Sequence, residues 1–219
     1  MARIAPKGYV RSIKNLLKEP TQPFKNLLVL DLECTCDKDK EIVPQEIIEL
    51  PCVAIRIKDW KVQDVFHEYI KPRFHPTLTP FCTELTGIMQ ETVDDQKHFP
   101  ETFFMFCKWL TEGGFFEEGN ESAFVTSGDW DLKVMLPKQC ELEGITVPEY
   151  FTSWIDLKRI FATATQYYPR SLRQMLVKLQ LPMHGRLHSG IDDVTNMIKV
   201  MEKLSKSYKP RYNITSTLK

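Results

Sequence analysis

The stretch "LLVLDLECTC", residues 27–36, decides the fold, because an unbroken apolar run leads directly into two acidic residues. A short apolar run bounded by polar residues is typical of a strand covered on both faces in an α/β sheet. Side chains alternate along a strand, so Asp31 and Glu33 are expected on one face and Leu32 on the other. Two such carboxylates repel each other and lose hydration, and a bound cation or a set of hydrogen-bond donors offsets both costs. Alternatively, the acids mark a strand end that frays into solvent.

Length and composition favour one well-packed domain. The chain has 219 residues, 42% of them hydrophobic, and a formal net charge of zero. Neutrality does not exclude a nucleic-acid partner, because metal ions and a local basic rim can bind a polyanion. No segment approaches the roughly 20 continuous apolar residues of a membrane span, so no membrane association is expected. The six cysteines lack C-x-x-C spacing and are interpreted as reduced thiols of an intracellular protein of the cytoplasm or nucleus.

The two ends of the chain differ from its middle. Residues 1–25 contain six Lys or Arg residues and one acid, and the stretch from Lys203 to Lys219 contains no acid at all. These patterns predict a basic N-terminal arm (residues 1–25) and a basic C-terminal tail (residues 207–219), both solvated, around a domain at residues 26–206. An acid-poor start is also compatible with a mitochondrial presequence, although Pro6 and Pro20 interrupt any long amphipathic helix.

Strand and helix patterns alternate between these ends. Strands are expected at residues 27–33, 46–57, 61–72, 122–127 and 154–157. Helices are expected at residues 80–88, 100–114, 129–144 with a kink at Pro137, directly after residue 157, at 171–181 and at 190–204. Three opening strands followed by alternating strands and helices predict an α/β fold, with a mixed central sheet and helices on both faces.

Further acids follow at points that can reach the same edge of the sheet. Ligands of doubly covered α/β sheets gather at the carboxyl ends of central strands. In "TSGDWD", Asp129 or Asp131 follows directly after a predicted buried strand, and in "HSGIDDVTN", His188 precedes a helix that carries Asp192 and Asp193 in its first turn. Each aspartate alone also has a structural explanation, because acids near a helix start cap free N–H groups and complement the helix dipole.

Taken together, the motifs resemble those of the DEDDh 3′-to-5′ exonucleases in order and spacing. They are D-x-E at a strand end, one Asp at the start of a middle helix, and H-x-x-x-x-D at the start of the last helix. The resemblance extends over residues 27–205. Within the superfamily, the chain is similar to the group of enhanced-RNAi and three-prime histone-mRNA exonucleases that includes insect Snipper. The segments that carry this similarity are "LDLECTCD", "QEIIELP", "FCTELTGI", "SGDWDLKVML", "SWIDLK" and "GRLHSGIDDVTN". The resemblance implies an RNase H-like fold and hydrolysis of RNA or single-stranded DNA from the 3′ end, with release of nucleoside monophosphates.

The resemblance also implies the roles of individual residues. Two Mg²⁺ ions, for which Mn²⁺ can substitute, would be bound by four carboxylates: Asp31, Glu33, Asp131 and Asp193. His188 would be the general base, because a neutral imidazole can accept a proton from water near neutral pH. Hard cations prefer such oxygen ligands and keep positions open for water and phosphate.

Substrate contacts are predicted at five further residues. By the same resemblance, Leu85 and Thr86 would lie beside the terminal base and sugar, and Cys34 and Thr35 near the terminal 3′-hydroxyl. Trp130 can stack on a nucleotide. Plain core packing is the alternative for Leu85 and Trp130.

Two other interpretations stay open. Zinc bound through His184 and His188 is disfavoured, because Pro182 and Gly185 prevent one continuous helix from presenting both. A non-catalytic nucleic-acid-binding module of the same fold is the alternative function, and the complete set of five motif residues favours catalysis. We expect a monomer whose partners are 3′ ends of RNA or single-stranded DNA, and the sequence does not choose between the two.

Overall fold

The apolar run of the opening stretch forms β1 (Asn26–Leu30), a fully buried strand in the middle of a seven-stranded sheet. In the computed structural model, which describes residues 21–218, β1 is antiparallel to β3 (Ile47–Arg56) and parallel to β5 (Ser122–Thr126). The short β2 (Glu33–Cys34) pairs with β3 further along the same side, so it continues the line of β1.

The remaining strands extend the sheet in both directions. The antiparallel β4 (Lys61–Tyr69) pairs with the other side of β3. At the opposite end, β5 is parallel to β6 (Ser153–Asp156), which is antiparallel to β7 (Ser216–Thr217). The predicted mixed sheet is therefore confirmed.

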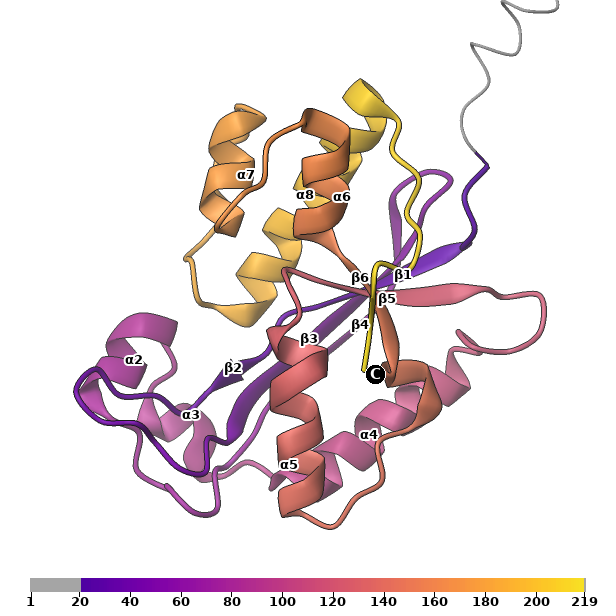
Figure 1. Cartoon of the computed structure of the whole chain (residues 1–219). Helices are drawn as coiled ribbons and strands as arrows, with labels where there is room; N and C mark the ends of the chain where they lie inside the picture. The colour runs from indigo at the N-terminus through magenta and orange to yellow at the C-terminus, as the bar shows by residue number, and fades with distance from the viewer. Residues whose placement is uncertain (1–20, 219) are drawn as a thin grey trace, which may run out of the picture.

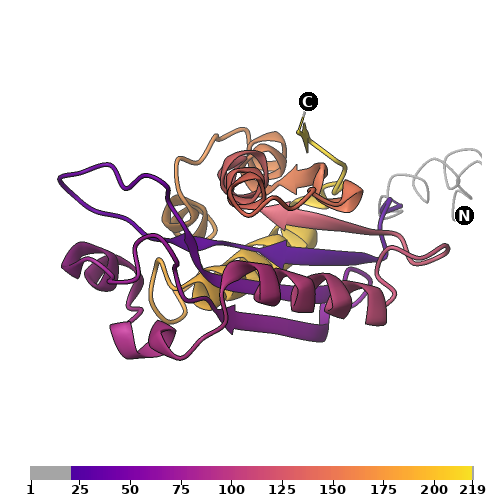
Figure 2. The same ribbon diagram turned by 90° about the horizontal axis from the view of Figure 1, so that it is seen from below.

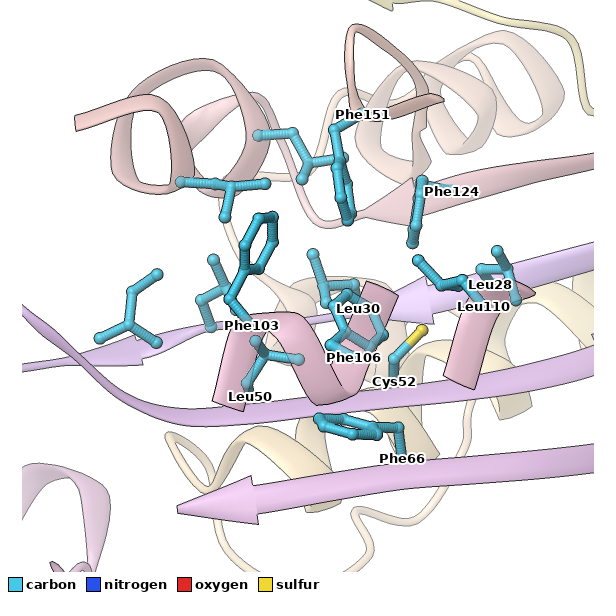
Figure 3. Close-up of a cluster of buried hydrophobic side chains, with 14 of the residues drawn as sticks. Leu28, Leu30, Leu50, Cys52, Phe66, Phe103, Phe106, Leu110, Phe124 and Phe151 are labelled. Carbon is cyan, nitrogen blue, oxygen red and sulfur yellow. The ribbon is translucent and has the colours of Figure 1, made fainter. Parts of the chain in front are cut away.

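Helices cover both faces of the sheet (Figures 1 and 2). One layer consists of α4 (Phe99–Glu112) and α5 (Leu136–Leu142), and the other of α6 (Leu157–Thr165), α7 (Leu172–Lys178) and α8 (Gly190–Tyr208). Because side chains alternate along β1, Leu28 and Leu30 join the core under the first layer, whereas Leu27 and Val29 join the core under the second. Figure 3 shows the first core, in which Phe103 and Phe106 of α4 pack toward these leucines.

Shorter elements lie between the main ones. They are α2 (Pro80–Thr86), α3 (Gln90–Asp94), a π-helical turn at Asp131–Met135 and a 3₁₀ turn at Glu149–Phe151. The helix expected from residue 129 begins only at Asp131, and its first turn is π-helical rather than α-helical. The Asp129 side chain does not cap this helix, because it accepts hydrogen bonds from Trp154 Nε1 at 3.2 Å and from Arg159 at 2.9 Å.

The prediction of a solvated C-terminal tail was wrong. The helix expected to end at residue 204 continues to Tyr208, and Tyr212 beyond it is fully buried, with its hydroxyl donating to the Met201 carbonyl at 2.8 Å. Apolar residues among the basic ones provide the reason, since they anchor the tail on the core and allow β7 to join the sheet. Within the predicted N-terminal arm, residues 1–20 lie outside the described residues, so the arm and the alternative presequence stay predictions.

Two further features concern the predicted class. None of the helices in residues 21–218 combines the length and apolarity that crossing a membrane requires. All six cysteines are free thiols.

Candidate active site

The five predicted motif residues come from three segments that meet at one edge of the sheet. Asp31 follows β1 directly, Glu33 opens β2, and Asp131 opens the π-helical turn after β5. His188 and Asp193 lie on either side of the start of α8. The segments that follow the central strands, the residues just before α8 and the first turn of α8 therefore supply all five side chains.

Gly190 allows the first turn of α8 to approach the strand that carries the opening acids. A Cβ atom built at Gly190 would lie 2.9 Å from the Asp31 carbonyl oxygen and 2.8 Å from Pro51 Cγ. Any side chain at this position would push the helix away, so a glycine is required by close approach. This contact brings the helix start to the end of β1.

Hydrogen bonds and short approaches connect the three segments. The Leu32 N–H donates to Asp131 Oδ1 at 2.9 Å, which joins the π-helical turn to the opening stretch. One ligand atom each of Glu33, His188 and Asp193 lies within 4.8 Å of the other two. The His188 N–H donates to Asp193 Oδ2 at 2.9 Å, and the His188 backbone is left-handed, with φ of 63°. The Asp193 side chain thus holds the His188 backbone in a strained conformation, and the exposed imidazole lies near Glu33 and Asp193.

Crowding and burial disfavour ionisation of the two opening acids. Burial, followed by the charges of Asp131 and Glu33, raises the pKa of Asp31 well above its ordinary value. Burial also raises the pKa of Glu33 to about 9, and the charges of Glu49 and Asp193 add to this effect. Without a cation, these side chains are therefore costly to ionise at neutral pH.

The other two acids show the same effect, partly opposed by backbone donors. Burial raises the pKa of Asp131 to about 6, whereas the hydrogen bond from the Leu32 N–H acts in the opposite direction. Burial also raises the pKa of Asp193, and the His188 N–H opposes it. Four carboxylates with raised pKa values in one place are the electrostatic pattern of a functional site.

The residues fit a divalent cation. Asp193 Oδ1 is buried and has no hydrogen-bond partner in the described part of the chain. Within residues 21–218, none of the four acids forms an ion pair with Lys or Arg. Clustered carboxylate oxygens with one imidazole are ligands for Mg²⁺ or Mn²⁺, and a bound ion would offset both the crowding and the unpartnered oxygen. The described cluster contains no cysteine and does not include His184, so it does not support the zinc interpretation.

One buried acid at this edge was missed by sequence reasoning. Glu49 of β3 is 1% exposed and lies opposite Glu33 in the strand register. Its carboxylate accepts hydrogen bonds from the N–H groups of Gly190 at 2.9 Å and Ile191 at 3.3 Å, and also contacts His67 Nε2 at 2.8 Å. Glu49 thus caps the start of α8. Its sequence signal is an acid within the otherwise apolar segment "IIELPCVAI", residues 47–55, where nothing along the strand can neutralise it.

The predicted contacts to the 3′-hydroxyl lie next to the acids. Cys34 is partly buried in β2, and Thr35 is buried with its hydroxyl accepting from the Glu46 N–H at 2.9 Å. The Thr35 side chain is therefore occupied within the fold. Its backbone is occupied as well, because the Thr35 N–H donates to the Glu46 carbonyl at 2.8 Å and the Thr35 carbonyl accepts from Gln45 Nε2 at 3.2 Å.

The predicted base and sugar contacts differ in exposure. Thr86 is buried, and its hydroxyl donates to the Cys82 carbonyl at 2.8 Å. Leu85 lines an open groove together with Arg186, and the Trp130 side chain is 40% exposed. Leu85 and Trp130 are thus available to a ligand, and the substrate roles of all five residues stay predictions.

The sheet is mixed, covered by helices on both faces, and lined at one edge by acids with one histidine beside them. These features define the class of protein as nuclease-type α/β domains with an RNase H-like fold. Residues 28–201 match the family RNase_T, described as "Exonuclease", and the chain belongs to this exonuclease family.

Named relatives agree with this assignment. The chain is 42% identical over 204 residues to ERI1 exoribonuclease 3 of Homo sapiens, covering 93% of this chain and 60% of that protein. It is 37% identical over 198 residues to the 3′-5′ exonuclease Snipper of Drosophila melanogaster, covering 84% of this chain and 70% of that protein. The nuclease domain of 3′hExo, a DEDDh family member, bound to rAMP, superposes with a TM-score of 0.81 at 28% identity, covering 89% of this chain and 98% of that one. The resemblance and the fold predicted from the sequence are confirmed.

Proposed function

We propose that this protein is a metal-dependent 3′-to-5′ exonuclease that releases nucleoside monophosphates from the 3′ ends of RNA. One observation carries the proposal: in a chain of the exonuclease family, Glu33, His188 and Asp193 converge within 4.8 Å, and the buried Asp193 Oδ1 has no partner in residues 21–218. RNA is the favoured substrate because the human relative is called an exoribonuclease and the 3′hExo domain binds rAMP. The chain spans about 60% of the human relative's length, and the proposed activity concerns the 219 residues of this chain.

The acids would hold two Mg²⁺ ions, or Mn²⁺ in their place, through Asp31, Glu33, Asp131 and Asp193. Bound divalent ions of this kind make a water molecule more acidic and stabilise charge on the phosphate. His188 accepts the proton of the attacking water at its imidazole nitrogen, since the side chain is exposed beside Glu33 and Asp193. The hydrogen bond from its backbone N–H to Asp193 Oδ2 at 2.9 Å holds the residue beside the acids.

End-labelled substrates test this proposal. RNA and single-stranded DNA of matched sequence, labelled at either the 5′ or the 3′ end, are incubated with Mg²⁺ or Mn²⁺. A ladder that shortens from the 3′ end, release of mononucleotides and loss of activity in excess chelator are expected. Binding of the oligonucleotides without any cleavage would instead support the non-catalytic module of the same fold.

A further inference from the structure

The two segments beside the active site carry opposite charge, although the whole chain is neutral. Residues 157–191, which include α6, α7 and the loop with His188, contain six Lys or Arg residues and no Asp or Glu. Residues 74–96, which include α2 and α3, contain four acids and no Lys or Arg. In Figure 1, α7 and α2 lie on either side of the first turn of α8. The two segments meet where the Arg186 guanidinium donates to the carbonyl oxygens of Glu84 and Leu85.

Exposed aromatic and basic side chains gather around α7. Tyr168 is 61% exposed and Val177 is 70% exposed. An open groove of about 310 Å³ is lined by Tyr167, Arg173, Gln174, Val177 and Lys178. We call this set, together with Tyr168 and Arg170, the α7 surface.

The cations of the α7 surface are available to an external anion. Arg170 and Arg173 are exposed, and neither forms an ion pair with any acid in residues 21–218. Arg159 of α6 differs, because Asp129 at 2.9 Å and Asp156 at 3.3 Å already neutralise it. Lys178 Nζ lies 5.4 Å from the centre of the Tyr167 ring, so a cation and an aromatic face are presented together.

This combination is the chemistry of single-strand binding. Guanidinium groups contact phosphates, and exposed aromatic rings stack on bases whatever the sequence. A merely solvated helix face would carry cations and anions together, with its aromatic rings buried. The acid-rich segment at residues 74–96 would repel the phosphates of a strand that left in the opposite direction.

On these observations, and on the proposed exonuclease function, we propose that the α7 surface binds the single strand on the 5′ side of its terminal nucleotide. The substrate therefore leaves the active site across α7, not across α2 and α3. Arg170 and Arg173 contact phosphates, and the more exposed Tyr168 stacks on a base.

A charge-neutralising double variant tests the proposal. For Arg170→Gln/Arg173→Gln, KM for a single-stranded RNA of about 20 nucleotides is expected to rise about tenfold or more, with kcat unchanged. The slope of log KM against log salt concentration is expected to fall by about 1.4, because each single-strand phosphate contact contributes about 0.7. A dinucleotide or trinucleotide that ends before α7 is expected to be cleaved at the parent rate. Tyr168→Ala is expected to raise KM for the long substrate about fivefold or more.

The matched control is Lys203→Gln/Lys206→Gln, which removes the same charge near the far end of α8. Equal KM values and salt slopes for the Arg170/Arg173 variant, this control and the parent protein would overturn the proposal. An equal loss of rate on short and long substrates would also overturn it, because it would indicate damage to the fold. If the parent protein cleaves nothing, the proposed function fails, but fluorescence anisotropy with a labelled 20-nucleotide RNA still tests the α7 surface. Weaker RNA binding by the Arg170/Arg173 variant alone would support the proposal. Equal RNA binding by all three proteins would refute it.

Discussion

Replacement of Glu33 by glutamine is expected to stabilise the metal-free protein, because ionised Glu33 is opposed by burial and by its acidic neighbours. Its pKa rises from 4.5 to about 9, with burial as the largest cause and Glu49 as the next. For an acid whose pKa is raised by folding, the contribution to stability is fully present below about pH 4.5 and is lost as the pH rises toward 9.

The magnitude follows from this shift. At pH 7 the folded protein keeps the Glu33 proton, whereas the unfolded chain releases it and is stabilised by an amount set by about 2.5 pH units. Each unit corresponds to about 1.4 kcal/mol, so Glu33→Gln removes a penalty on the order of 3 kcal/mol at pH 7. In a chain of this size about 1 kcal/mol raises the melting temperature by roughly 2–4 °C, so a rise of several degrees is expected.

Thermal unfolding followed by circular dichroism checks this in excess chelator at pH 5 and at pH 8. The glutamine variant should melt several degrees above the parent at pH 8 and close to it at pH 5. Addition of Mn²⁺ should stabilise the parent protein more than the variant, since the variant has lost a ligand oxygen. The exposed Glu41→Gln serves as control and should change neither profile. A variant that melts below the parent at pH 8, or a difference that is the same at both pH values, would refute the electrostatic reasoning.

Three further predictions concern residues around the start of α8. His188→Ala should lower the cleavage rate by about 10²–10⁴-fold, as expected for loss of a general base, while Mn²⁺ binding measured by titration calorimetry is retained; loss of Mn²⁺ binding would make His188 a ligand instead. Gly190→Ala should destabilise the fold by about 1–3 kcal/mol in urea unfolding, because the new Cβ would lie 2.9 Å from the Asp31 carbonyl oxygen, and parent-like stability would show that the helix start can move. Glu49→Ala should leave the N–H groups of Gly190 and Ile191 without their acceptor and lower the free energy of unfolding by about 1–3 kcal/mol. Glu49→Gln keeps one acceptor oxygen and should therefore recover part of this stability in the same urea unfolding assay.

Local patterns predicted most of the sheet and a group of acids at its edge, and the resemblance to the DEDDh exonucleases selected the five motif residues among them. Both faces of β1 are buried, so its continuous apolar run predicted a strand without knowledge of the strands beside it. The acids that follow this run stand out from it in the sequence. The C-terminal tail shows where such reading fails. Its Lys and Arg residues indicated solvent, but Tyr212 reaches the core and contacts Met201, a partner that only the folded chain brings near. The short α3 and the π-helical turn at Asp131 likewise depend on tertiary packing, because neither has the length to produce a periodic pattern.

Glu49 was missed for a related reason, and it shows how buried acids with different roles can be told apart. A buried carboxylate in an apolar strand is unfavourable unless donors surround it, and the N–H donors of Glu49 come from the start of α8, 141 residues further along the chain. Glu46 is similar, since its two oxygens accept from the N–H groups of residues 73–75. Asp193, in contrast, keeps one buried oxygen without a partner in residues 21–218. An acid whose oxygens are all occupied by protein donors holds the fold together. An acid with a buried free oxygen, placed beside other acids and a histidine, has room for a partner from outside the polypeptide, and in the proposed function a divalent cation would be that partner. Hydrogen-bond satisfaction therefore assigns Glu46 and Glu49 to the scaffold and Asp193 to the proposed metal site, although all three are buried acids and two of them lie at the same edge of the sheet.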